Sequence, residues 1–515
     1  MTREDGLKLL GRTRALAAAA RRALAAPPSG AGHWWIWPVL MSGLVLAQHW
    51  SYATRPDVHE GAWKIREVTG VHEASLYDYG MHYWGLVPVY SLDVLELPRG
   101  DDSLYSEEEA EWILVERGHT LRMEHNITLR TGERTVRVMK YPLALWKDSA
   151  FQLRYELMIG GVYAFGLILL SLALWRYAPF PLCIFLPLVV GSSAFVAADI
   201  YRWQRPLTVL IIAPIYAMAL LAPVVFDRPL RTRSLVLRLV ALAGFLVLMV
   251  NLRRTPIALL PCIAIVVLLY RQRGLLWRLT QVGVFLVSFV ALSWSFDAWW
   301  EGKYQETLRV VKAVGGVPFQ MRVNPHHDVW HTIFIGFEDF DTKYDFRWRD
   351  FHGHQYARPL LEEMGFEPTE DEVRYGVLWQ KVPGYDALIR DRLLEIVRED
   401  PGWYLDVVRG RIHRILWENE GPRLNLVFAD LQLPSSPWPY LGFALLLVAI
   451  GALPFLKLLV LALPTVSVPL LVTTYGGQQH LSITHLVVAA MLLTACWMGT
   501  SAATRHLRST AGRQR

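Results

Sequence analysis

Long apolar blocks alternate with polar segments along this chain, and the blocks predict membrane-spanning helices. They cover residues 34–50, 155–175, 179–199, 206–226, 235–251, 255–270, 279–298, 437–455, 458–475 and 481–501. Several contain the roughly 18 apolar residues that a helix needs to cross a bilayer. The pattern therefore predicts an α-helical polytopic membrane protein with about ten transmembrane helices.

Two long polar segments interrupt these blocks and divide the chain. The predicted parts are a basic N-terminal segment (1–33), a first span (34–50), a first outer segment (51–154), spans two to seven (155–298), a second outer segment (299–436), spans eight to ten (437–501) and a tail (502–515). The first outer segment is expected to be mixed α/β, because a capping box at 106–109 precedes extended stretches at 120–128 and 134–139. The second is expected to be mostly helical, with an amphipathic helix over 384–399 and another opening at Pro401.

The distribution of basic residues predicts which side of the membrane each segment faces. Many fall in segments that would share one side, among them Arg176, Arg228, Arg231, Arg233, Arg271, Arg273, Arg278 and Lys457. The short loops of the other side carry only Arg202, Arg205, Arg253 and Arg254. Because cytoplasmic loops carry the excess of lysine and arginine, both termini are expected in the cytoplasm beneath an inner (plasma) membrane. Both long polar segments then face outward.

Composition excludes several classes of function. The formal net charge of +6 is explained by the inner segments, so it does not indicate nucleic-acid binding. The three cysteines, Cys183, Cys262 and Cys496, fall inside predicted spans, so the outer segments hold no disulfide and no cysteine metal site. The centres of the spans between 155 and 298 hold almost no ionisable residue, which argues against an ion-coupled transporter.

An acidic pair in the first outer segment, Asp101–Asp102, is the first candidate for catalysis. Adjacent carboxylates raise each other's pKa, which suits a general base or a metal ligand. At the outer membrane face such a base could deprotonate an incoming hydroxyl. The structural alternative is a turn over 98–103, in which aspartate caps the next helix.

Arginines on the outer side form a second candidate site. They are Arg253, Arg254, Arg202 and Arg205. Basic residues are disfavoured on that side, and guanidinium groups bind phosphate through paired hydrogen bonds, so these residues are candidates for holding an anionic phosphate. Contact with ordinary lipid headgroups is the alternative.

A histidine-rich stretch, 324–356, is the third candidate. Within it His327 and His331 are four residues apart, which on a helix would place both on one face at the spacing of some zinc sites. A divalent metal is therefore the one cofactor that the sequence raises. No glutamate follows the first histidine as in HExxH, however, and Pro325 and the phenylalanines favour an aromatic, hydrogen-bonded loop covering the active face.

The order of these features resembles the GT-C glycosyltransferases, polytopic enzymes that use lipid-phosphate-linked sugars. The likeness extends over 34–300 and rests on Asp101, Asp102, Tyr105, Ala110, Tyr141–Pro142–Leu143 and the turn with Arg253–Arg254. This chain departs from the family in the turn before the second span and in carrying its outer domain between spans. The family's acidic residue closely follows the first span, where this chain has Asp57. The resemblance therefore implies Asp57, Asp101 or Asp102 as the base.

These features together predict glycosyl transfer at the outer membrane face from a polyprenyl-phosphate sugar to a glycan, lipid or protein acceptor. The donor phosphate would be held by Arg253, Arg254, Arg202 and Arg205. The acceptor would contact Tyr105, Lys140, Tyr141, Trp330 and His331. Two alternatives stay open. One is a non-catalytic membrane protein whose outer domains bind polysaccharide or a partner for envelope assembly, and the other is a polysaccharide polymerase or ligase.

Overall fold

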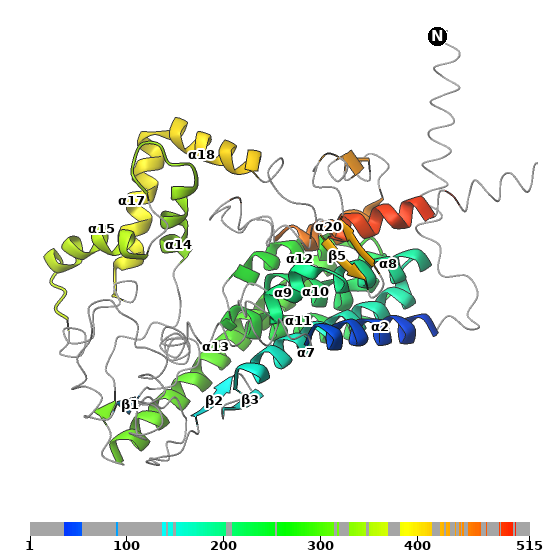
Figure 1. The fold of residues 1–515 in the computed structure, drawn as a ribbon, viewed down its shortest axis with the longest axis horizontal. Coiled ribbons are helices and arrows are strands. Elements are labelled where there is room, and N and C mark those ends of the chain that lie inside the picture. Colours follow the sequence, from blue (N-terminus) through cyan, green and yellow to red (C-terminus); the bar gives the residue numbers. More distant parts are fainter. Residues whose placement is uncertain are drawn as a thin grey trace, which may run out of the picture.

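The computed structural model shows a predominantly helical chain whose apolar helices associate it with a membrane (Figure 1). It describes residues 36–53, 89–90, 136–140, 143–147, 151–201, 209–252, 255–313, 317–318, 329–346, 350–368, 382–414, 423–426, 429–432, 438, 442–443, 445–446, 452–464, 470, 484, 486–497 and 500. Among the described residues, three stretches are long and apolar enough to cross a membrane: Gly160–Tyr177, Thr232–Val250 and Leu275–Trp299. The predominantly helical class is thus confirmed, with helices that could span a membrane, while the count of about ten spans stays a prediction.

The first half of the bundle is built from five helices. Helix α2 (Ile36–Ala53) packs against α7 (Phe151–Tyr177) and α8 (Phe180–Gly191), and α7 packs along α10 (Val209–Val225). The span predicted at 179–199 is broken, because α8 ends at Gly191 and a new helix, α9 (Ala194–Tyr201), follows. The hydroxyl of Ser193 accepts a 3.3 Å hydrogen bond from the N–H of Val196 and so caps α9.

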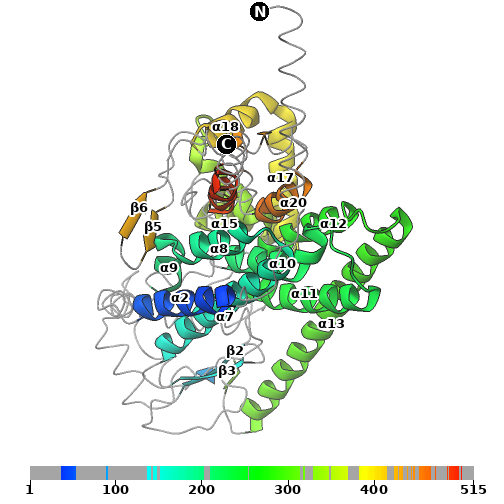
Figure 2. The same cartoon turned by 90° about the vertical axis from the view of Figure 1, so that its right-hand side faces the viewer.

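The second half of the bundle comprises α11 (Thr232–Leu252), the short 3-10 helix η2 (Thr255–Ala258), α12 (Leu259–Leu268), α13 (Leu275–Ala313) and α20 (Leu453–Ala462). Helix α13 has 39 residues and extends beyond its neighbours in both views (Figures 1 and 2). Helix α20 packs on α10 and α12 and runs unbroken through 456–457, where the apolar pattern predicted a boundary between two spans. The helix begins at Leu453 after the non-helical Ala452, so the boundary lies N-terminal to its predicted position, and Lys457 is a fully buried residue within α20.

In the part of the chain that the structure describes, three two-stranded antiparallel sheets accompany the helices. They pair β1 (Val89–Tyr90) with β4 (Val317–Pro318), β2 (Val136–Lys140) with β3 (Leu143–Lys147), and β5 (Arg423–Leu426) with β6 (Ala429–Gln432). The strand predicted at 134–139 is therefore found as β2, and β3 pairs with it in antiparallel register.

Residues 329–414 contain a second, smaller group of helices, which we call the outer helical unit. It comprises α14 (Val329–Gly336), the 3-10 helix η3 (Phe337–Phe340), α15 (Asp350–Glu363), α17 (Tyr385–Glu399) and α18 (Pro401–His413), and it lies to one side of the bundle (Figure 1). Its own core buries Phe334, Phe337, Phe346, Leu361, Tyr385, Ile389 and Val407. The mostly helical fold expected here is confirmed, as are the predicted α17 and α18.

The loop expected over 324–356 is wrong for the described part of that stretch. Residues 329–336 form α14 and residues from 350 begin α15, joined by η3 and an irregular segment over 341–346. The phenylalanines that suggested a covering loop are instead core residues. Phe334 and Phe346 pack edge to face, with ring centroids 4.8 Å apart.

Candidate functional site

Most of the residues predicted to act in catalysis, in donor or acceptor binding or in metal binding lie outside the described residues. These are Asp57, Asp101, Asp102, Tyr105, Tyr141, Arg202, Arg205, Arg253, Arg254 and His327. Lys140 is the last residue of β2, and Trp330 and His331 lie in α14. The assignment of roles to all of these residues stays a prediction.

His331 faces the interior of the outer helical unit rather than solvent. Its side chain is 1% exposed, and its Nδ1 lies 2.7 Å from the hydroxyl of Tyr385. The His354 ring stacks on the His331 ring with centroids 5.7 Å apart. Gly353 makes this approach possible, because a Cβ there would lie 2.5 Å from the Tyr385 hydroxyl and 2.9 Å from Nδ1 of His331. In this arrangement His331 links α14 to α17 through Tyr385.

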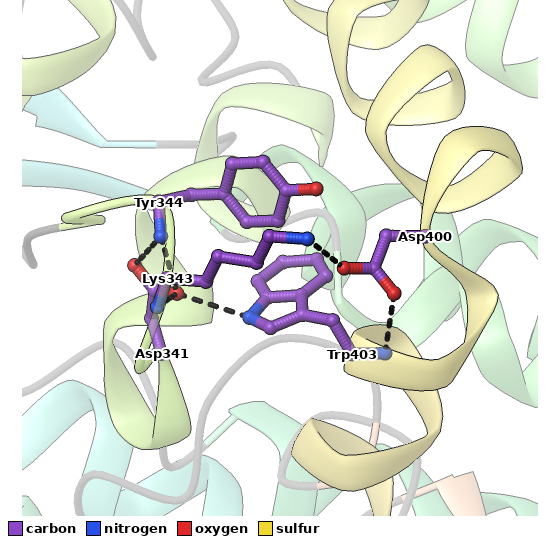
Figure 3. A network of polar contacts seen from close by, with 5 residues as sticks. All are labelled: Asp341, Lys343, Tyr344, Asp400 and Trp403. Carbon is purple, nitrogen blue, oxygen red and sulfur yellow. Dashed lines mark hydrogen bonds and ion pairs between the residues drawn. The ribbon is translucent and has the colours of Figure 1, made fainter.

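A network of polar contacts in the unit centres on Asp341 (Figure 3). Its carboxylate accepts hydrogen bonds from the backbone N–H groups of Lys343 (2.9 Å), Tyr344 (2.9 Å) and Phe346 (2.7 Å). The indole Nε1 of Trp403 in α18 donates a fourth bond of 3.0 Å. One side chain thereby fixes the irregular segment over 341–346 and ties it to α18.

These hydrogen bonds also set the charge state of Asp341. Burial alone would raise the pKa of its carboxyl, but the N–H groups that surround it outweigh burial and lower the pKa below its ordinary value. The carboxylate is therefore ionised and its acceptor sites are occupied. Such a group stabilises structure and is a poor proton acceptor.

A second carboxylate, Asp400, completes the network from the other side. It caps α18 by accepting a 3.0 Å hydrogen bond from the N–H of Trp403, and it pairs with the ammonium of Lys343 at 2.5 Å (Figure 3). The bond from Lys343 is the largest cause that lowers the pKa of Asp400. The sequence missed this network. The signal for it was an aspartate followed by Thr-Lys-Tyr, which is typical of an Asx turn.

A buried arginine joins the outer helical unit to the C-terminal part of the chain. Arg411 of α18 is fully buried and donates to the carbonyls of Gly336 (2.7 Å) and Leu470 (3.2 Å). Its Nε lies 3.8 Å from Asp339, whose carboxylate also lies 3.7 Å from Arg414. Burial lowers the pKa of Arg411, and the nearby Asp339 opposes this effect. The contact with Leu470 crosses from the unit to a residue of the predicted membrane region.

Hydrogen bonds between turns show which helix ends lie together. The Tyr270 hydroxyl donates to the carbonyl of Arg228 (2.7 Å), and Arg228 donates to the carbonyl of Tyr177 (3.3 Å). The C-terminal ends of α7, α10 and α12 therefore meet at one end of the bundle. The opposite end must hold the starts of α7, α10 and η2 and the end of α11. The segments with the candidate aspartates and outer arginines leave the described helices at that opposite end.

The described geometry defines a helical protein with apolar helices that could span a membrane and with an outer helical unit in which His331, Asp341 and Arg411 serve structural contacts. Within the described part of the chain, no group of three histidine, cysteine, aspartate or glutamate side chains could hold a metal ion. Comparison with protein-family models, with curated proteins and with solved structures gives no match to this chain.

Proposed function

We propose that this chain is a membrane glycosyltransferase that moves a sugar from a polyprenyl-phosphate donor to a glycan, lipid or protein acceptor at the outer membrane face. The observation that carries the proposal is the shared end of the bundle at which α11 ends and α7, α10 and η2 begin. The segments that meet these helix ends contain the candidate bases and the four candidate phosphate-binding arginines. A lipid-linked donor holds its phosphate at the membrane surface, where both sets of residues would reach it.

In the proposed reaction, the acceptor hydroxyl attacks the anomeric carbon of the sugar. The carboxylate of Asp57, Asp101 or Asp102 takes the hydroxyl proton. The bond between the anomeric carbon and the phosphate oxygen breaks, and polyprenyl phosphate leaves with the electron pair. Arg253 and Arg254 stabilise the charge that develops on the leaving phosphate.

A non-catalytic role in binding a polysaccharide or a partner protein is a second candidate, favoured by the state of His331. This residue was predicted to contact the acceptor, but it is 1% exposed and its ring contacts Tyr385 and His354. The outer helical unit would then be a rigid platform that presents its surface to a ligand.

The test is a transfer assay with the purified full chain in lipid nanodiscs and a panel of polyprenyl-phosphate hexoses and pentoses. We expect release of polyprenyl phosphate, and we expect Asn in place of one of the three candidate aspartates to lower kcat by about 10²- to 10⁴-fold without loss of folded protein. Arg253→Lys should weaken donor binding because lysine cannot form the paired bonds.

Matched controls are Asp391→Asn on the surface of α17 and Arg271→Lys at the opposite end of the bundle. Both should keep wild-type turnover. Full turnover in all three aspartate variants would exclude the assigned base. Absence of release from every donor by folded wild-type protein would favour the binding role instead.

A further inference from the structure

Three segments distant in sequence converge at the end of the bundle opposite to the proposed active site. They are the turn after α10 (226–231), the turn after α12 (269–274) and Lys457 of α20. Asp227 connects them, because its Oδ1 accepts hydrogen bonds from the Lys457 ammonium (2.8 Å) and from the N–H of Arg271 (3.0 Å). We call this region the arginine end of the bundle.

The charge of the arginine end is strongly positive. Between residues 209 and 278 the sequence has a single acidic residue, Asp227, and Lys457 pairs with it. The arginines of this end are Arg176, Arg228, Arg231, Arg233, Arg238, Arg271, Arg273 and Arg278. The described turns at this end contain no other acidic residue, so the exposed arginines can attract an anion.

These arginines divide into two groups by their contacts. Four donate to backbone carbonyls and so cap or brace helices: Arg228 to Tyr177, Arg238 to Leu220, Arg273 to Leu230 and Arg278 to Leu268. The side chains of Arg231, Arg233 and Arg271 are exposed, and they form no hydrogen bond or ion pair with any other described residue. Arg273 brings the two turns together, since its acceptor Leu230 directly precedes Arg231.

Apolar side chains continue from these arginines along the membrane-facing helices. Leu237 is 70% exposed and lies one turn after Arg233 on the same face of α11. Leu276 at the start of α13 is 80% exposed, and its neighbour Trp277 is covered by the guanidinium of Arg273 at 5.5 Å. The cations at the helix ends are suited to an anionic headgroup, and the exposed leucines next to them are suited to acyl chains. Together they match an amphiphile that carries both.

We propose that the arginine end binds an anionic phospholipid. Arg231, Arg233 and Arg271 contact its phosphate, and Leu237 and Leu276 contact its acyl chains. Guanidinium groups form paired hydrogen bonds with phosphate oxygens, and clusters of basic residues at this depth attract anionic headgroups. The site is independent of sugar transfer, because it lies at the other end of the bundle.

The experiment uses the purified full chain in nanodiscs of phosphatidylcholine alone or with phosphatidylglycerol. Native mass spectrometry releases the protein from the nanodisc and counts the lipids that stay bound to it. We expect the wild-type chain to retain phosphatidylglycerol selectively. The triple variant Arg231→Gln, Arg233→Gln, Arg271→Gln should retain it about tenfold less, and raising the salt concentration should reduce retention by the wild type.

A control variant removes the same charge elsewhere: Arg358→Gln, Arg390→Gln, Arg392→Gln on the outer helical unit. It should retain phosphatidylglycerol like the wild type. A Leu237→Ser, Leu276→Ser variant should also retain less phosphatidylglycerol than the wild type, because it keeps the arginines but loses the contacts with the acyl chains. The proposal is overturned if the triple variant retains as much phosphatidylglycerol as the wild type, or if the wild type retains phosphatidylcholine as well as phosphatidylglycerol. Displacement of the lipid by millimolar inorganic phosphate would overturn it as well.

Discussion

Asp341 shows how one residue can organise an irregular segment. Residues 341–346 have no regular helix or strand to satisfy their N–H groups, and the carboxylate of Asp341 accepts three of them. The fourth bond, from the Trp403 indole, fixes α18 against the same segment. Hydrogen bonds to a charged acceptor contribute more to stability than those between neutral groups. Asp341 is therefore the residue on which the order of this segment depends most.

Replacing Asp341 by asparagine should destabilise the outer helical unit by about 2–3 kcal/mol. An amide has one acceptor oxygen, and its NH₂ group would face N–H donors that need an acceptor. Hydrogen exchange of residues 329–414 in the full chain measures the effect. The control Asp391→Asn changes a carboxylate that is 64% exposed and should leave exchange unchanged. Equal protection in wild type and Asp341→Asn would show that the network adds little.

The same carboxylates predict how this unit responds to acid. The folded-state pKa values of Asp341 and Asp400 lie below their ordinary value of 3.8. Their stabilising contribution is therefore complete above pH 3.8 and is lost as the pH falls below it, through the lowered folded-state values. Asp341→Asn should weaken this acid dependence. The measurement is protection of residues 329–414 as a function of pH.

At the scale of elements, the packing of α7 against α10 depends on a glycine. Gly166 of α7 faces the ring of Tyr216 in α10, and a Cβ at residue 166 would lie 2.6 Å from that ring. Tyr216 cannot move aside easily. Its hydroxyl donates to the carbonyl of Val162 (2.8 Å), and its ring stacks on Phe245 of α11 at 3.9 Å between centroids. The residue thus joins α7, α10 and α11.

Gly166→Ala should lower stability by about 1–3 kcal/mol, because the added methyl group overpacks a contact that is held on two sides. Gly161 in the same helix is the matched control, since a Cβ there meets nothing within 4 Å and alanine is the better helix former. Thermal unfolding of the detergent-solubilised chain compares the two. A Gly161→Ala variant as unstable as Gly166→Ala would contradict the packing argument.

At the scale of the whole molecule, the pair of Asp227 and Lys457 joins segments 230 residues apart. Asp227 ends α10 in a left-handed conformation with φ 49°, and the N–H of Arg228 closes the turn on the carbonyl of Pro223 at 2.8 Å. This is the Schellman arrangement, with aspartate in place of the usual glycine. The fully buried Lys457 also donates to the carbonyl of Val224 at 2.8 Å. The C-terminal helices are held to the first half of the bundle here.

The two partners of this pair should not be equivalent. Asp227→Asn leaves an ammonium buried without its counter-charge and should cost about 3–5 kcal/mol. Lys457→Met keeps the volume, and it leaves a carboxylate that is 19% exposed and still bonded to the N–H of Arg271, so its cost should be smaller. Thermal unfolding of the solubilised variants and of the double variant measures both. A larger loss for Lys457→Met would refute this asymmetry.

Periodicity in the sequence predicted α17 and α18 well, because their apolar positions recur at helical spacing and Pro401 marks the start of the second. It failed over 324–356, where aromatic residues without clear periodicity were interpreted as a loop. It also placed Lys457 in an inner loop, because a lysine between apolar blocks ordinarily marks a boundary. Its partner Asp227 could not be identified from sequence, since the pairing depends on how α20 packs against α10.

The sequence by itself determined the membrane class, the alternation of apolar helices and polar segments, and the concentration of arginine at one end, because these follow from composition and local pattern. The tertiary structure decided which charges are buried, which arginines cap helices and which stay exposed, and that Asp341 and His331 hold the outer helical unit together. Those properties arise from contacts between residues far apart in the chain, and local pattern carries no information about such contacts.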